Sequence, residues 1–127
     1  MDSTERLTKI LVCEDSNVIN MIIQYRLVKD GYDVEIARDG QAAIEKLDST
    51  SYDLIITDLL MPFTSGLELI NKIRYELNSK VPIIVVSALD NESSIIEALK
   101  LGADDYITKP FSPSELSIRV KKLLIRK

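Results

Sequence analysis

Short apolar runs alternate with longer amphipathic segments along the whole chain. The runs are about four residues long and rich in β-branched side chains, and three of them are continuously apolar, which is typical of strands buried on both faces. Between the runs, apolar residues recur at three- and four-residue spacing, the period of a helix that covers a core. The pattern predicts strands at 10–13, 34–37, 54–57, 83–86 and 106–108, and helices at 17–30, 40–48, 65–77, 92–101 and 113–126.

This strict alternation of strand and helix predicts an α/β fold, (βα) five times over, in a single domain spanning 1–127. Right-handed crossovers then give a parallel sheet with helices on both faces. Gly31 and Gly102 stand where helices should end, and Asn91 can cap the helix at 92–101. A sheet of this kind binds its ligands at the carboxyl ends of its strands.

Composition narrows the chemistry that the chain can perform. It has no histidine and one cysteine, Cys13, which excludes Ser-His-Asp and Cys-His catalysis, His-ligated metals and an internal disulfide. Its four glycines are too far apart for a nucleotide-binding glycine loop. What remains is chemistry based on carboxylates, lysines, hydroxyls and a hard metal ion.

Charge and hydropathy limit the partners and the compartment. The net charge of −4 argues against direct nucleic-acid binding and against binding to an anionic membrane. The apolar runs are too short to span a bilayer, and the first residues lack the apolar region of a signal peptide. We therefore expect a cytoplasmic protein that does not associate with membranes.

Polar residues directly follow four of the predicted strands. Glu14 and Asp15 follow the first strand, Asp58 the third, Ser87 the fourth and Lys109 the fifth. Because the carboxyl ends of parallel strands meet at one edge of a sheet, these side chains should converge. Each also has a simpler explanation when taken alone: Glu14 and Asp15 as helix caps, Asp58 as a turn residue and Lys109 as a loop lysine.

Three converging carboxylates repel one another, and a divalent cation relieves that repulsion. Ligands that are all oxygens favour Mg²⁺ over zinc or copper. A carboxylate can also attack phosphorus and form an acyl phosphate. Lys109 and Ser87 would then pair with the phosphoryl oxygens.

The whole set of motifs resembles the receiver domain of bacterial two-component response regulators. The resemblance extends over essentially all 127 residues, with the motifs in the family's order and spacing. It implies a flavodoxin-like three-layer sandwich with strand order 2-1-3-4-5. The matching segments are Glu14-Asp15, Asp58 with Met61-Pro62, Gly66, Ser87-Ala88, Gly102-Ala103-Asp104-Asp105-Tyr106 and Lys109-Pro110-Phe111.

The resemblance also implies a role for each site residue. Asp58 would accept a phosphoryl group from a sensor histidine kinase or a histidine phosphotransfer protein. Mg²⁺ would be bound by Asp15, Asp58 and the backbone carbonyl of Leu60, with Glu14 acting largely through water. Lys109 would contact the phosphoryl group, and the peptide bond that follows it would be cis.

The family's switch and output surface can be carried over in the same way. Ser87 would move toward the new phosphoryl group and Tyr106 would rotate inward, although a static Tyr106 is the alternative. The output face for a downstream effector would include Ile95, Leu99, Tyr106 and Arg119. Receivers of winged-helix transcription factors dimerise through this face, but Ile95 stands at a position that is usually basic there, so a homodimer stays open.

The helix at 17–30 carries two apolar stripes where packing on a sheet needs one. We expect the first stripe to face the sheet. The second stripe, which includes Met21 and Tyr25, either covers the last helix or is a docking surface for the kinase. The first comprises Ile19, Ile22, Ile23 and Leu27, and the second Val18, Met21, Tyr25 and Val28.

Two other function classes compete with a phosphorylation switch that catalyses only its own phosphorylation and dephosphorylation. A Mg²⁺-dependent phosphohydrolase with an aspartate nucleophile generally needs a second aspartate two residues later, and here that residue is Leu60. A degenerate receiver used only as a binding scaffold would lack Asp58, Asp15 or Lys109, and all three are present.

Overall fold

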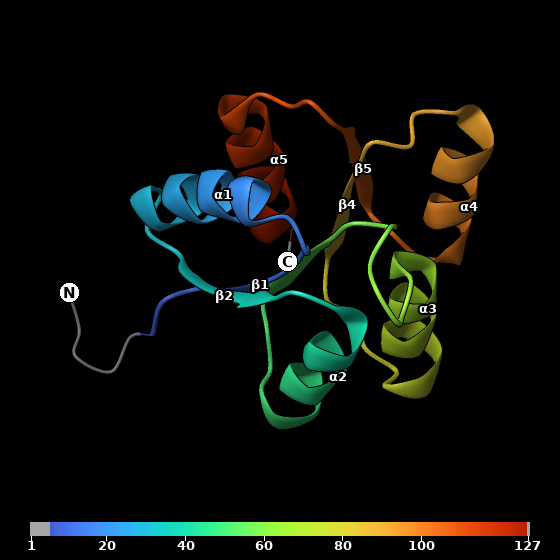
Figure 1. Ribbon diagram of the computed structural model, residues 1–127. Coiled ribbons are helices and arrows are strands. Elements are labelled where there is room, and N and C mark those ends of the chain that lie inside the picture. The colour runs from blue at the N-terminus through green and yellow to red at the C-terminus, as the bar shows by residue number, and fades with distance from the viewer. Residues whose placement is uncertain (1–5, 127) are drawn as a thin grey trace.

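The computed structural model describes residues 6–126 and contains the predicted alternation of strands and helices (Figure 1). The strands are β1 (Lys9–Cys13), β2 (Asp33–Ala37), β3 (Leu54–Thr57), β4 (Ile83–Ser87) and β5 (Asp105–Thr108). The helices are α1 (Asn17–Lys29), α2 (Gly40–Ser49), α3 (Gly66–Asn71) with its continuation η1 (Lys72–Glu76), α4 (Glu92–Leu101) and α5 (Pro113–Ile125).

All the strands pair in parallel, in the order β2-β1-β3-β4-β5. The predicted fold class and strand order are therefore confirmed. The chain leaves β1 toward β2 on one side and returns to β3 on the other, so the order reverses between β1 and β3. Such a switch point opens a crevice beyond the carboxyl ends of the two strands.

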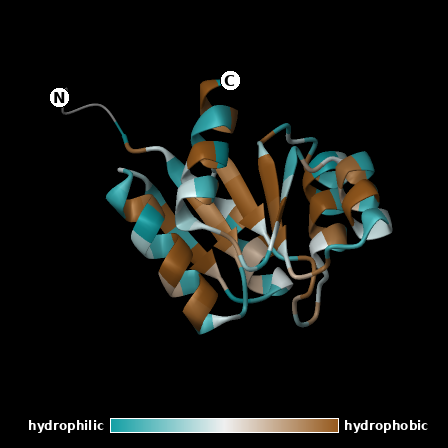
Figure 2. Cartoon of the chain, turned by 90° about the horizontal axis from the view of Figure 1, so that it is seen from above, coloured by the Kyte–Doolittle hydropathy of each residue, from teal (hydrophilic) through white to brown (hydrophobic). Residues whose placement is uncertain are grey.

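Two hydrophobic cores hold the three layers together, one on each face of the sheet. Helices α1 and α5 cover one face, while α2, α3 and α4 cover the other (Figure 1). In Figure 2 the strands form a nearly continuous apolar band between the helices of the two outer layers. Among the described residues, no helix has the length and apolar character needed to cross a bilayer.

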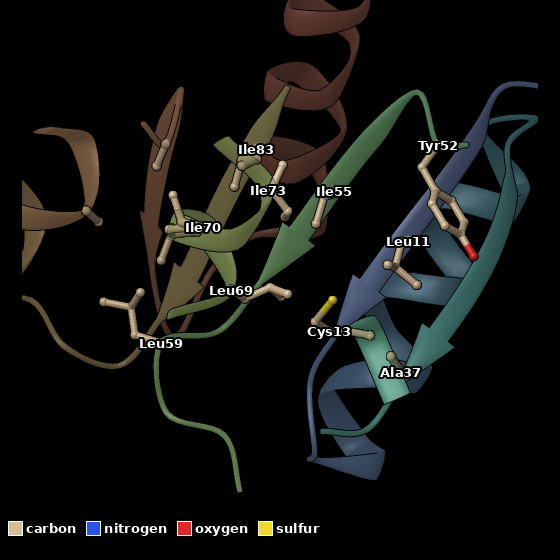
Figure 3. Close-up of a cluster of buried hydrophobic side chains, with 14 residues drawn as sticks. Leu11, Cys13, Ala37, Tyr52, Ile55, Leu59, Leu69, Ile70, Ile73 and Ile83 are labelled. Carbon is tan, nitrogen blue, oxygen red and sulfur yellow. The ribbon is translucent and has the colours of Figure 1, made fainter. Parts of the chain in front are cut away.

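Cys13 lies in the core beneath α2 and α3, beside Leu11 and Ala37 (Figure 3). It is fully buried, and burial raises the pKa of its thiol to about 12. A thiol in this environment stays protonated at neutral pH and is a poor nucleophile. Cys13 is thus a small core side chain.

The helix predicted at 65–77 is not uniform. After Asn71 it continues as a π-helix, and Leu77 N–H donates to the Lys72 carbonyl at 2.9 Å. The wider turn coincides with Arg74, whose guanidinium donates to three backbone carbonyls outside the helix. These carbonyls belong to Ser79, Val81 and Gly102.

The structure decides between two explanations of the residues before α1. The N-cap of α1 is Ser16, whose hydroxyl accepts from Ile19 N–H at 3.3 Å. Glu14 and Asp15 are therefore not capping residues. Asn91 occupies the N-cap position of α4, as predicted, although its side chain accepts no backbone N–H there.

The second apolar stripe of α1 faces outward. Met21 is 70% exposed and Tyr25 72% exposed, so the alternative that this stripe covers α5 is wrong. The contact between α1 and α5 is instead polar at Arg26, which donates to Ser117 Oγ at 2.9 Å. Ile22, expected to face the sheet, is 40% exposed because it lies at the edge between the two stripes.

Gly66 generates the first prediction, because it packs directly against the backbone before it. A Cβ at this position would lie 2.1 Å from the Asp58 carbonyl oxygen and 2.7 Å from Leu59 Cα. We expect Gly66→Ala to lower the free energy of unfolding by about 3 kcal/mol in urea titrations, since backbone atoms must shift. At Gly31 a Cβ would meet nothing within 4 Å, although φ is +102°. Gly31→Ala should therefore cost only about 1 kcal/mol, and equal losses would contradict the steric argument.

Candidate functional site

The sheet itself positions the residues that follow its strands. Backbone hydrogen bonds continue past the strand ends: Glu14 N–H donates to the Ala37 carbonyl at 3.0 Å, and Asp58 N–H to the Cys13 carbonyl at 3.0 Å. Lys109 N–H donates in the same way to the Ser87 carbonyl at 2.8 Å. Each of these residues is therefore held by a neighbouring strand, and all lie at one edge of the sheet.

The Lys109 ammonium is the centre of the site. Its Nζ lies 2.6 Å from Glu14 Oε1 and 2.9 Å from Asp58 Oδ2. Glu14 is 3% exposed and Asp58 6% exposed, so two carboxylates are buried against one shared cation. The structure brings these three predicted residues together, and the Lys109-Pro110 peptide is cis, as expected.

Burial and charge act in opposite directions on this trio. Burial raises the pKa of Glu14, and the nearby Asp58 charge adds to that rise, while Lys109 and the Ser16 N–H oppose it. The net pKa of Glu14 is above its usual value. Burial alone would lower the pKa of Lys109, but hydrogen bonds to Asp58 and Glu14 outweigh burial and raise it. Lys109 therefore stays charged at neutral pH.

The Asp58 carboxylate is held from two sides. Oδ2 accepts from Lys109, and Oδ1 accepts from Leu60 N–H at 3.2 Å. The Leu60 side chain points into solvent, and the Asp15 side chain is also exposed. The residues after β1 and β3 thus place one exposed carboxylate, two buried carboxylates and the backbone of Leu60 around the switch point.

These groups suit a hard cation by their chemistry. The donors at this edge are oxygens, from Asp15, Asp58, Glu14 and the backbone of Leu60, and oxygen ligands are those that Mg²⁺ prefers. Within residues 6–126, no three His, Cys, Asp or Glu side chains are already gathered into a metal-binding group. Glu14 and Asp58 point instead at Lys109, which supplies the positive charge in this arrangement.

Ser87 and Tyr106 are linked through one residue of the loop after β4. Ser87 is fully buried, and its Oγ accepts from Leu89 N–H at 3.2 Å. The Tyr106 hydroxyl donates to the Leu89 carbonyl at 2.5 Å, and the half-buried ring packs against the core on the α2–α4 side. Burial raises the pKa of Tyr106, against the lowering effect of the nearby Ser87 hydroxyl.

The face formed by α4, β5 and α5 departs from expectation in one respect. Leu99 is exposed, but Ile95 is half-buried against neighbouring residues rather than displayed on the surface. Arg119 is already paired within the chain, 2.7 Å from Asp105 and 3.1 Å from Glu115.

Two residues near the site were missed by the sequence analysis. Asn20 is 4% exposed and its Nδ2 donates to the Glu14 carbonyl at 2.7 Å. The available signal was a polar residue among the sheet-facing positions of α1, next to Ile19 and before Ile23. Phe63 is 86% exposed and has φ of 72°, a strained conformation for an aromatic residue. Sequence alone carries no signal for that strain.

Solved structures resemble this chain closely in fold. The receiver domain of the Francisella response regulator 1452 superposes with a TM-score of 0.89 at 40% identity, covering 94% of this chain and 98% of that one. The chemotaxis response regulator CheY4 of Vibrio cholerae gives a TM-score of 0.86 at 29% identity, covering 93% and 99%.

Related sequences are about twice as long. The chain is 42% identical over 118 residues to the alkaline phosphatase synthesis transcriptional regulatory protein PhoP of Bacillus subtilis, covering 93% of this chain and 49% of the relative. It is 41% identical over 126 residues to the transcriptional regulatory protein ResD of Bacillus subtilis, covering 99% and 51%. The chain thus spans about half the length of these curated relatives.

A family model also matches most of the chain. A model of the response regulator receiver domain matches residues 10–121, which include the described site and all of the strand residues except Lys9. Proteins of this family are signalling switches rather than classical enzymes, work with histidine kinases and effector domains, and typically bind Mg²⁺ at the phosphorylation site. The chain belongs to the receiver-domain family of two-component response regulators.

Proposed function

We propose that this chain is a phosphorylation-activated switch in which Asp58 is the phosphoryl acceptor. A carboxylate oxygen of Asp58 attacks the phosphorus of a phosphohistidine, an O–P bond forms, and the N–P bond breaks with its electron pair going to the imidazole. These 127 residues contain no histidine, so the phosphohistidine lies outside them, on a histidine kinase or a phosphotransfer protein. The observation that carries this proposal is the buried Asp58 carboxylate held between Lys109 and the Leu60 N–H.

Lys109 supports this role because its charge is available to more than one anion. It holds Glu14 and Asp58 together at 2.6 and 2.9 Å. When Asp58 becomes an acyl phosphate, its carboxylate charge is replaced by a dianionic phosphoryl group nearby. Lys109 can pair with one phosphoryl oxygen without leaving Glu14, since an ammonium has three donors.

Mg²⁺ fits the remaining donors. We assign Asp15, Asp58 and the Leu60 carbonyl as its ligands, with Glu14 acting through water. When bound, the cation supplies positive charge that lowers the repulsion between Asp58 and the incoming phosphoryl group. The chain catalyses only its own phosphorylation and dephosphorylation in this proposal.

The contacts of Leu89 suggest how the signal leaves the site. Ser87 Oγ accepts from the Leu89 N–H, and Tyr106 donates to the Leu89 carbonyl. A phosphoryl group that draws the Ser87 hydroxyl toward itself removes that support from the Leu89 backbone. The loop and Tyr106 then change together, which alters the face made by α4, β5 and α5.

Two surfaces are proposed for partners in the cytoplasm. The exposed face of α1, with Met21 and Tyr25, is the proposed contact for the kinase or phosphotransfer protein. The face with Ile95, Leu99, Tyr106 and Arg119 is proposed for an effector domain or protein and for a homodimer. The net charge of −4 favours neither nucleic acid nor an anionic membrane as a direct partner of this domain.

The acceptor assignment is tested by phosphorylation with acetyl phosphate and Mg²⁺. Intact-mass spectrometry should show the addition of one phosphoryl group to the wild type, and none to Asp58→Asn, because an amide does not attack phosphorus. Asp48→Asn changes an exposed carboxylate on α2 and is the matched control, which should be phosphorylated like the wild type. An adduct that survives in Asp58→Asn would place the acceptor elsewhere.

The buried carboxylate of Glu14 should lower the stability of the folded protein at neutral pH. Because the folded environment raises this pKa, ionising Glu14 costs more free energy in the folded protein than in the unfolded chain, and Glu14→Gln should raise the free energy of unfolding at pH 7 by about 1 kcal/mol. The gain should disappear below about pH 4, where Glu14 is protonated in both the folded and the unfolded state. Urea titrations of both proteins at the two pH values measure this difference. A lower stability of the variant at pH 7 would show that the Lys109 bond outweighs burial.

The α1 surface can be tested separately from the chemistry of the site. Met21→Glu with Tyr25→Glu should slow phosphotransfer about tenfold from a histidine kinase that phosphorylates the wild type, which corresponds to ~1.4 kcal/mol of lost contact. The rate with acetyl phosphate and the urea midpoint should not change. Gln41→Glu with Ser49→Glu, two exposed positions on α2, adds the same two negative charges away from this surface. Kinase transfer that is equally fast in all three proteins would reject the docking role.

A further inference from the structure

Helix α1 buries three residues toward the sheet, and one of them is polar. Ile23 and Leu27 are apolar, whereas Asn20 is an amide that is 4% exposed. It lies one turn after the Ser16 cap, and its own N–H donates to the Ser16 carbonyl at 3.0 Å as part of the helix. Its side chain is therefore free to interact beyond the helix.

The Asn20 amide makes one bond and leaves one atom without a partner. Nδ2 donates to the Glu14 carbonyl at 2.7 Å, and this contact fixes the orientation of the amide because two acceptor oxygens would repel at that distance. Oδ1 is buried, and no donor among the described residues reaches it. An unsatisfied buried oxygen is unfavourable, so packing alone would favour an apolar residue such as leucine here.

The bond that Asn20 makes acts on the acidic pair. The Glu14 carbonyl is part of the peptide unit that joins Glu14 to Asp15. The hydrogen bond from Asn20 to this carbonyl therefore restrains the backbone between the two acidic residues. The same residue is held at its N–H by the Ala37 carbonyl and at its side chain by Lys109 and the Ser16 N–H. The Asp15 side chain itself is exposed.

We propose that Asn20 is a positioning residue that fixes the Glu14–Asp15 peptide plane and so preorganises the acidic pair for a divalent cation. The inference rests on the proposed function, in which this pair binds Mg²⁺. Asn20 does not touch the cation in this proposal. It acts through the backbone, in the way that outer hydrogen-bond partners orient metal ligands.

The test replaces Asn20 with the apolar side chain of nearly equal size. In Asn20→Leu, the Mg²⁺ dissociation constant measured by calorimetry on the unphosphorylated chain should rise about tenfold. Amide hydrogen exchange at Asp15 and Ser16 should become about tenfold faster without Mg²⁺, while exchange in β1 and β3 stays as in the wild type. The urea midpoint should not fall, because the unpaired Oδ1 is removed as well. Asn17→Leu, an exposed change on the same helix, should match the wild type in all three measurements.

Each outcome bears on the proposal. Unchanged Mg²⁺ affinity and unchanged exchange at Asp15 and Ser16 in a folded Asn20→Leu protein overturn it. If leucine disturbs folding, Asn20→Ser takes its place, because its side chain is too short to reach the Glu14 carbonyl. A loss of stability in this variant with Mg²⁺ affinity unchanged would show that Asn20 serves only in packing and would overturn the proposal. A wild type that binds no Mg²⁺ refutes the metal part of the proposed function, and the exchange rates then still decide whether Asn20 orders the Glu14–Asp15 peptide.

Discussion

The arrangement at the carboxyl edge of the sheet depends on one ammonium group held between two buried carboxylates. Glu14 and Asp58 would repel each other strongly at this depth if Lys109 did not lie within 3 Å of both. The three residues come from strands that are far apart in sequence, and only the parallel sheet brings them to one point. Lys109 therefore ties β1, β3 and β5 together chemically, just where the backbone ladders end.

The region around this trio is not built for maximal stability. Glu14 is buried in an environment that raises the pKa of its carboxyl, and Asn20 keeps a buried oxygen without a partner among the described residues. Phe63 adds a strained backbone conformation of a kind that costs about 1–3 kcal/mol, in the loop between Asp58 and Gly66. Such features persist where the rest of the fold is stable enough to hold them. Here two continuous apolar cores, one on each face of the sheet, provide that stability.

Away from the trio, two polar networks connect the site to the rest of the molecule. Leu89 joins Ser87 to Tyr106, so the end of β4 and the middle of β5 share one loop residue. At the opposite end of the sheet, Arg74 binds the carbonyls of Val81 and Gly102 and the carboxylate of Asp104. Arg74 thus anchors β4 and β5 at the ends where the chain enters them.

Periodicity along the chain was sufficient to determine the alternation of strands and helices, because burial on one face or on both leaves a direct trace in the order of apolar residues. Motif spacing was sufficient to place Glu14, Asp58 and Lys109 at one edge, because parallel strands align their carboxyl ends. Only the tertiary structure showed that Lys109 contacts both carboxylates, that Tyr106 lies against the Leu89 loop, and that Ser16 rather than Glu14 caps α1. It alone showed the π-turn at Arg74, the half-buried Ile95 and the buried amide of Asn20. Some of these features are contacts between residues far apart in sequence, such as Lys109 with Glu14, and others are local, such as the Ser16 cap. In both cases the partner of a side chain is decided by packing geometry, which the hydrophobic pattern does not record.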